Sequence, residues 1–135
     1  MIPNACETLV TLRILLCMVV IFGFGCGVSS TNELNGVYSV RYAHGSETLT
    51  LNDDGTFDQV YTQVEDGHST TNSGTWVFKK ERGDILLRDV FVFDDNDKRR
   101  QKLNKAVWTI KIAKRFGKIS LIIGEEGVLE YDKTK

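Results

Sequence analysis

Short segments that alternate apolar and polar residues, separated by turn signals, run through the chain after residue 35. In residues 47–51 two leucines alternate with threonines, and Asn52-Asp53-Asp54-Gly55 follows as a tight turn, because Asp-Gly supplies the positive φ that hairpin turns need. The single proline, Pro3, lies far from these segments, so no strand is interrupted. The pattern therefore predicts β-structure throughout this part of the chain.

The same pattern fixes an approximate strand count. Strands are predicted at residues 37–42, 47–51, 56–64, 74–79, 84–93, 106–113, 119–123 and 128–131, and residues 65–73 are predicted as a polar loop. About eight short strands at regular spacing favour an antiparallel up-and-down meander. The predicted fold class is all-β, either a closed barrel or a sandwich, preceded by an N-terminal signal or anchor helix.

Residues 14–24 form an apolar run, ILLCMVVIFGF, with no charged side chain. A helix of this length spans roughly 16 Å, about half the thickness of a bilayer's hydrocarbon core. A short apolar run behind Arg13 and before small residues is typical of a secretory signal. An uncleaved membrane anchor and a buried core helix are the two alternatives.

The three cysteines are Cys6, Cys17 and Cys26. Cleavage just before Cys26 would remove the other two, leaving the exported part without an internal disulfide or a cysteine-based zinc site. Residues 27–35, GVSSTNELN, are small and polar and are predicted to form a tether. An export signal on a domain without disulfides is unusual for an ordinary secreted protein.

The stretch Gly23-Phe24-Gly25-Cys26 resembles the lipobox of bacterial lipoproteins. The resemblance implies that signal peptidase II cuts before Cys26 and that this cysteine carries the lipid; Gly23 departs from the usual leucine. It implies a signal peptide at 1–25, a tether at 26–35, a β domain at 36–135 and a lipid anchor on the membrane of a bacterial cell envelope. Secretion after cleavage at an ordinary signal site near residues 28–30 is the alternative, as is a single-pass anchor.

The segments GVYSV, TLTLNDDGTFDQVYT and SGTWVF, within residues 36–78, resemble the lipocalin-like domains of small bacterial lipoproteins. Those domains begin with a Gly-x-Tyr or Gly-x-Trp strand and continue with Leu-x-Leu, Gly-x-Phe and Gly-x-Trp. The resemblance covers less than half of the chain and concerns core and turn residues. It implies an up-and-down barrel with a small apolar cavity, and it says nothing specific about function.

No constellation of residues in the sequence predicts catalysis or a metal. His44 and His68 lie in predicted loops without metal-ligand spacing, and no Gly-x-Ser-x-Gly elbow is present. The acidic residues 94–97 are followed at once by the basic run 98–102, which disfavours a calcium site. With 17 Lys+Arg against 18 Asp+Glu, the chain lacks the basic bias of a nucleic-acid binder. We expect no enzyme activity, no cofactor and no nucleic-acid partner.

Aromatic residues recur at alternate positions of the predicted strands. On the inner face of a barrel such residues are both core and cavity lining, and eight strands leave room for one small ligand. We therefore expect a membrane-anchored binding or envelope-accessory protein for a small apolar ligand. The alternative is a secreted inhibitor or interaction module that acts through residues 65–73 or 94–104, with an unknown protein partner. The predicted cavity-lining residues are Tyr38, Phe57, Trp76, Trp108 and Tyr131.

Overall fold

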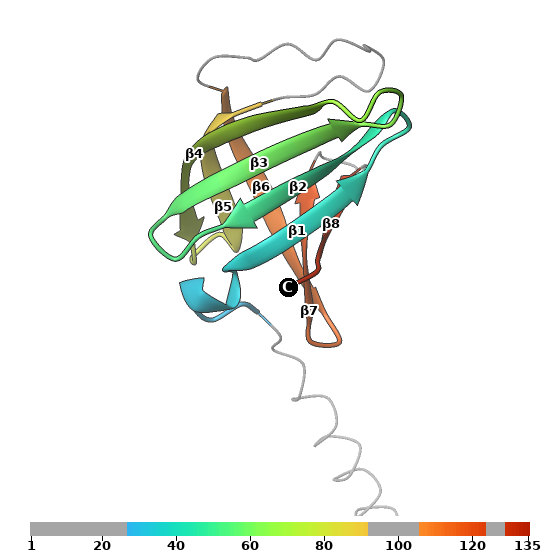
Figure 1. Ribbon diagram of the computed structural model, residues 1–135. Helices are drawn as coiled ribbons and strands as arrows, with labels where there is room; N and C mark the ends of the chain where they lie inside the picture. The colour runs from blue at the N-terminus through green and yellow to red at the C-terminus, as the bar shows by residue number, and fades with distance from the viewer. Residues whose placement is uncertain (1–26, 92–105, 124–128) are drawn as a thin grey trace, which may run out of the picture.

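Eight strands and one short helix make up the described part of the chain. The computed structural model describes residues 27–91, 106–123 and 129–135. The elements are the 3-10 helix η1 (Thr31–Glu33) and the strands β1 (Gly36–Arg41), β2 (Gly45–Leu51), β3 (Thr56–Gln63), β4 (Ser69–Lys79), β5 (Asp84–Val90), β6 (Ala106–Arg115), β7 (Lys118–Ile123) and β8 (Leu129–Lys133). Each strand pairs antiparallel with the next, and β8 pairs with β1, so the sheet closes into a barrel (Figure 1). The all-β meander is confirmed, and the sandwich alternative is wrong.

The predicted strands differ from the observed ones most in β4. The sequence predicts a loop at residues 65–73, yet β4 begins at Ser69, and its residues from Ser69 to Thr75 pair with β3. Its first residues are exposed hydroxyl and amide side chains, which carry no hydrophobic signal but suit an exposed strand surface. Backbone pairing with the long strand β3 therefore extends β4 beyond its apolar part. Other strand ends that lie within the described residues shift by a few positions.

The turn between β2 and β3 follows directly from its residues. Asn52 donates its backbone N–H to Thr56 O, and the Asp54 carboxylate accepts hydrogen bonds from the backbone and side chain of Thr56. Gly55 takes a φ of +82°, which a side chain would disfavour. The Asp-Gly turn signal is thus confirmed in atomic detail.

A short seam between β1 and β8 closes the barrel. Tyr38 pairs with Lys133, and beyond this pair Val37 donates its backbone N–H to Lys135 O at 3.0 Å. Gly36 makes the approach feasible, since a Cβ atom there would lie 2.2 Å from Lys135 O. A side chain at residue 36 would therefore force the seam apart.

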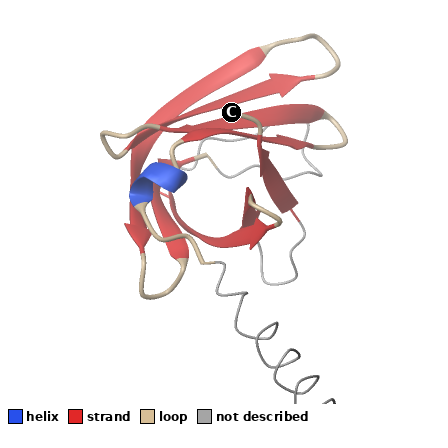
Figure 2. Cartoon of the chain, turned by 90° about the horizontal axis from the view of Figure 1, so that it is seen from below, coloured by secondary structure: helices blue, strands red, loops and turns tan. Residues whose placement is uncertain are grey.

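One end of the barrel is covered by η1 and the residue after it (Figure 2). Leu34 is 0% exposed, and its carbonyl accepts a 2.7 Å hydrogen bond from the Tyr38 hydroxyl. On the outside, Glu33 forms a 2.7 Å ion pair with Lys114 of β6. The end of the predicted tether is therefore packed against the barrel as a plug.

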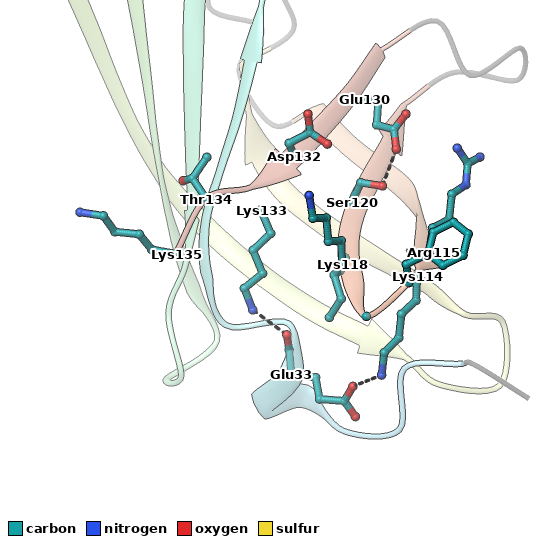
Figure 3. Close-up of a pocket in the computed structure, with 13 residues that line it drawn as sticks. Glu33, Lys114, Arg115, Lys118, Ser120, Glu130, Asp132, Lys133, Thr134 and Lys135 are labelled. Atoms are coloured by element: carbon teal, nitrogen blue, oxygen red, sulfur yellow. Dashed lines mark hydrogen bonds and ion pairs between the residues drawn. The ribbon is translucent and has the colours of Figure 1, made fainter.

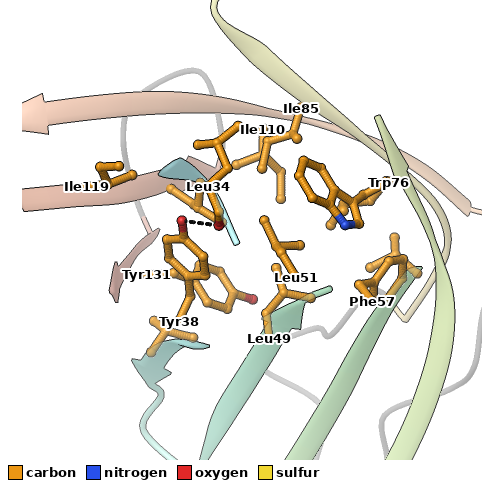
Figure 4. Close-up of a cluster of buried hydrophobic side chains, with 14 residues drawn as sticks. Leu34, Tyr38, Leu49, Leu51, Phe57, Trp76, Ile85, Ile110, Ile119 and Tyr131 are labelled. Carbon is orange, nitrogen blue, oxygen red and sulfur yellow. Dashed lines mark hydrogen bonds between the residues drawn. The ribbon is translucent and has the colours of Figure 1, made fainter. Parts of the chain in front are cut away.

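The hydrophobic core lies inside the barrel and includes Leu34, the residue that follows η1 (Figure 4). Strand alternation places one residue in two inside, as in β2, whose odd-numbered residues are all buried. The buried members of the cluster are Leu34, Tyr38, Val40, Leu49, Leu51, Phe57, Trp76, Ile85, Leu87, Val90, Ile110, Ile119, Leu121 and Tyr131.

Candidate functional site

The five aromatic residues predicted to line a cavity all belong to the barrel interior. Tyr38 and Phe57 are 0% exposed, Tyr131 is 1% exposed and Trp76 is 3% exposed. Trp108 is partly buried and packs against the same cluster. In this structure these side chains pack in the core, and their contact with a ligand stays a prediction.

A buried carboxylate lies inside the barrel, on the side of the hydrophobic cluster that faces away from η1. Glu47 on β2 is 1% exposed. Its Oε1 accepts a 2.6 Å hydrogen bond from Gln59 Nε2, and its Oε2 accepts one of 2.7 Å from the Tyr42 hydroxyl. The Tyr42 hydroxyl also lies 3.0 Å from that of Tyr131. These hydrogen bonds offset part of the cost of burying a charge-bearing group.

Gln59 connects this carboxylate to the end of β5. Its side-chain oxygen accepts a 3.0 Å hydrogen bond from Phe91 N, while its Nε2 donates to Phe91 O at 3.1 Å. Asn72 of β4 donates to both Gln59 Oε1 and Asp89 O. The amide therefore fixes the backbone where β5 ends, next to the polar part of the interior.

We call Glu47, Gln59, Tyr42 and Tyr131 the polar cluster. It lies toward the barrel end opposite η1, because Tyr42 directly follows β1 at the turn into β2. Sequence reasoning missed Glu47 and Gln59, although a signal was present. Glu47 has the same parity as Leu49 and Leu51 on β2, and Gln59 lies between two buried aromatic residues on β3.

The surroundings of the buried tyrosines raise their pKa values. Burial, followed by the nearby Glu47 carboxylate, raises the pKa of Tyr131 well above its ordinary value of 10.0. Burial alone raises the pKa of Tyr38, whose hydroxyl donates to a backbone carbonyl. Both hydroxyls therefore stay protonated at neutral pH and act as hydrogen-bond partners.

The two histidines lie in exposed turns and not in the barrel interior. His44 and His68 are exposed in the turns β1–β2 and β3–β4, which are joined by a hydrogen bond from Val64 N to His44 O. Within the described ranges, no group of three or more His, Cys, Asp and Glu side chains could hold a metal ion. The candidate lipidation residue Cys26, the leader 1–25 and the charged residues 94–104 lie outside the described residues.

The described residues include no helix that is both long and apolar enough to cross a membrane.

A groove lies on the outside of the barrel beside the β6–β7 turn (Figure 3). Its volume is about 900 Å³, and η1, β6, β7 and β8 contribute its walls. The groove is lined by three acidic side chains, those of Glu33, Glu130 and Asp132, and by five basic side chains. The basic side chains are those of Lys114, Arg115, Lys118, Lys133 and Lys135.

No protein-family model, no curated protein and no solved structure matched the chain.

Proposed function

We propose that the chain is a membrane-anchored, non-enzymatic β-barrel binding protein of the cell envelope. Its ligand has a small apolar body and a head group that donates hydrogen bonds or carries a positive charge. The observation that supports this ligand class is the buried polar cluster, with the Glu47 carboxylate at its centre.

From the position of the polar cluster we infer at which end of the barrel the ligand enters and how large it can be. Leu34 and η1 cover one end, so a ligand would enter from the end that carries Tyr42. An eight-stranded barrel encloses only one small molecule. The apolar body would contact Val40, which pairs with Glu47 across β1 and β2, and Leu49, which lies two residues after Glu47 on β2.

We infer the preferred head group from Glu47, whose two side-chain oxygens accept hydrogen bonds inside the barrel. A carboxylate accepts hydrogen bonds and attracts cations, whereas it repels a second carboxylate in a low-dielectric interior. We therefore propose that an alkyl amine binds better than the alcohol or the acid of equal chain length.

Binding rather than catalysis is supported by how the functional groups are distributed. Glu47 is held by the donors of Gln59 and Tyr42, while both histidines lie in exposed turns. A nucleophile and a base within hydrogen-bonding distance are the usual signature of covalent catalysis. The polar cluster instead resembles the few convergent polar groups of a ligand pocket.

Ligand-detected saturation-transfer NMR on the full chain in nanodiscs tests the ligand class. Hexylamine, hexanol and hexanoate serve as chain-matched probes. We expect a saturable signal for hexylamine that E47Q removes and E130Q retains, since Glu130 is an exposed residue of β8. The absence of saturable binding by any probe, or equal binding of all three in wild type and E47Q, would contradict this function.

The membrane anchor needs its own experiment. Its support is the lipobox-like stretch that ends at Cys26, behind the apolar residues 14–24. Labelling of cells with a radioactive fatty acid should mark the wild-type chain and leave Cys26→Ser unmarked. Equal label in both would rule out lipidation at this cysteine.

A further inference from the structure

The β6–β7 turn exposes a large aromatic side chain at its tip. Arg115 pairs with Lys118, so Phe116 and Gly117 form a two-residue turn. Phe116 has a φ of +51° and is 103% exposed, meaning that it contacts almost nothing in the barrel. A bulky residue is unfavourable in this left-handed conformation, where Asn or Gly is usual. Neither the turn geometry nor packing within the barrel explains this phenylalanine.

Basic residues flank the turn that carries the exposed ring. Arg115 and Lys118 flank the turn directly, and Lys135 lines the adjoining groove. Among the described residues, no carboxylate forms an ion pair with any of these three side chains, whereas Glu33 pairs with Lys114. An exposed aromatic tip beside cations that form no ion pair is a combination that suits a membrane interface, because the ring enters the headgroup region and the cations attract anionic lipids.

The same edge of the barrel carries the start of the described chain. Ser29 donates its backbone N–H to the Glu33 carboxylate, and that carboxylate pairs with Lys114, one residue before Arg115. The segment that leads back to residue 27 therefore leaves the barrel beside the β6–β7 turn (Figure 1). A chain held to a bilayer through its N-terminal residues would present this edge to the lipid.

We propose that the β6–β7 turn, with Arg115, Phe116 and Lys118, is a docking surface for an anionic lipid bilayer. The proposal rests on the membrane anchor of the proposed function only for bringing the barrel to the membrane. The exposed Asp53-Asp54 turn, which joins β2 to β3, lies at the same end of the barrel as the β6–β7 turn but on the opposite side of the ring of strands. Docking at this edge leaves the end that carries Tyr42 accessible to a ligand.

Depth-dependent fluorescence quenching tests the docking surface in the full chain. F116W and V64W place an exposed tryptophan at opposite ends of the barrel, since Val64 is 75% exposed in the β3–β4 turn. Trp76 and Trp108 are present in both variants, so their contribution to the fluorescence cancels in the comparison. In vesicles of phosphatidylcholine and phosphatidylglycerol, brominated lipid should quench F116W and leave V64W at the background value.

Charge reversal separates lipid docking from simple exposure. Adding R115E/K118E to F116W should shift the docked-to-free ratio by roughly thirtyfold or more toward free, and the quenching should be lost. R41E/R88E makes the same change of net charge at exposed positions of β1 and β5 and should preserve the quenching. High salt should weaken quenching in F116W, because exposed charges are screened.

Three results would overturn the docking surface. The first is equal quenching in F116W and V64W, and the second is quenching of F116W that does not depend on phosphatidylglycerol. The third is a chain that stays off the vesicles and leaves both variants unquenched; fatty-acid labelling reports separately on Cys26. The hexylamine experiment measures ligand binding at the polar cluster. A negative result in that experiment is therefore independent of a negative result for lipid docking at the β6–β7 turn.

Discussion

The two ends of the barrel interior differ although the same strands build both. Near η1, β2 and β3 contribute Leu51 and Phe57, which pair across the two strands. Two residues along each strand the pair becomes Leu49 and Gln59, and the next pair is Glu47 and Tyr61. Alternation therefore decides which side chains point inward, while their chemistry changes along the barrel axis. We infer that the apolar end near η1 supplies stability and that the polar cluster supplies specificity.

The largest expected effect tests the apolar end. Phe57→Ala removes a side chain that is 0% exposed in the core cluster, and the lost contacts and the resulting cavity should lower the free energy of unfolding by about 3–5 kcal/mol. Urea unfolding followed by tryptophan fluorescence measures the change. Val77→Ala, at a half-exposed position of β4, is the control and should change the free energy by less than about 0.5 kcal/mol. A similar small loss in both variants would show that this end does not dominate stability.

A smaller loss of stability is expected when one side chain of the polar cluster is removed. Gln59→Ala leaves the backbone N–H of Phe91 and one Glu47 oxygen without the amide, so the free energy of unfolding should fall by about 1–3 kcal/mol. Thr62→Ala on the same strand removes only an exposed hydrogen bond to Ser69 and should have little effect. If Gln59→Ala matched Phe57→Ala, the distinction between the two ends would fail.

The sequence predicted the eight-strand meander because turn chemistry and alternation agree along the chain. It could not distinguish a barrel from a sandwich, since closure depends on the pairing of β1 with β8, two segments at opposite ends of the domain. It also missed the first residues of β4, where exposed threonines give no apolar period. Local pattern therefore determines which residues form strands, and long-range pairing determines how the sheet ends.

The candidate site was less predictable than the fold. The aromatic residues were expected inside and lie there, but the polar cluster was not foreseen. A lone glutamate or glutamine in a strand usually faces solvent, so composition argues against burial of Glu47 and Gln59. Their mutual hydrogen bond, the Tyr42 hydrogen bond to Glu47 and the contacts of Gln59 with Phe91 offset the cost of burial, and these join residues that lie far apart in the sequence.

The plug at the apolar end should respond to loss of a single hydroxyl. Tyr38→Phe keeps the ring and removes the 2.7 Å hydrogen bond to Leu34 O, and should cost about 0.5–1.5 kcal/mol of the free energy of unfolding. Amide hydrogen exchange at Leu34, whose N–H donates to Thr31 O, should accelerate at the same time. Tyr131→Phe is the matched change at the polar cluster and should leave exchange at Leu34 unaltered. Equal acceleration in both variants would mean that the two ends are coupled.

The smallest expected effect comes from the outer face of the plug. The hydrogen bond from Lys114, followed by the hydrogen bonds from Ser29, lowers the pKa of Glu33 from 4.5 to about 2. Because the pKa is depressed in the folded state, this carboxylate stabilises the barrel fully above pH 4.5, and the contribution is lost as pH falls toward 2. Glu33→Gln should therefore show a weaker fall in the free energy of unfolding over this interval than wild type does, as measured by urea titrations at stepped pH. Glu130→Gln, at an exposed carboxylate of the same groove, controls for the general effect of removing a charge. Parallel pH profiles for wild type and Glu33→Gln would show that the Glu33 carboxylate does not help to hold η1 against the barrel, which would leave the buried Leu34 and the hydrogen bonds to the Leu34 and Glu33 carbonyls to close this end.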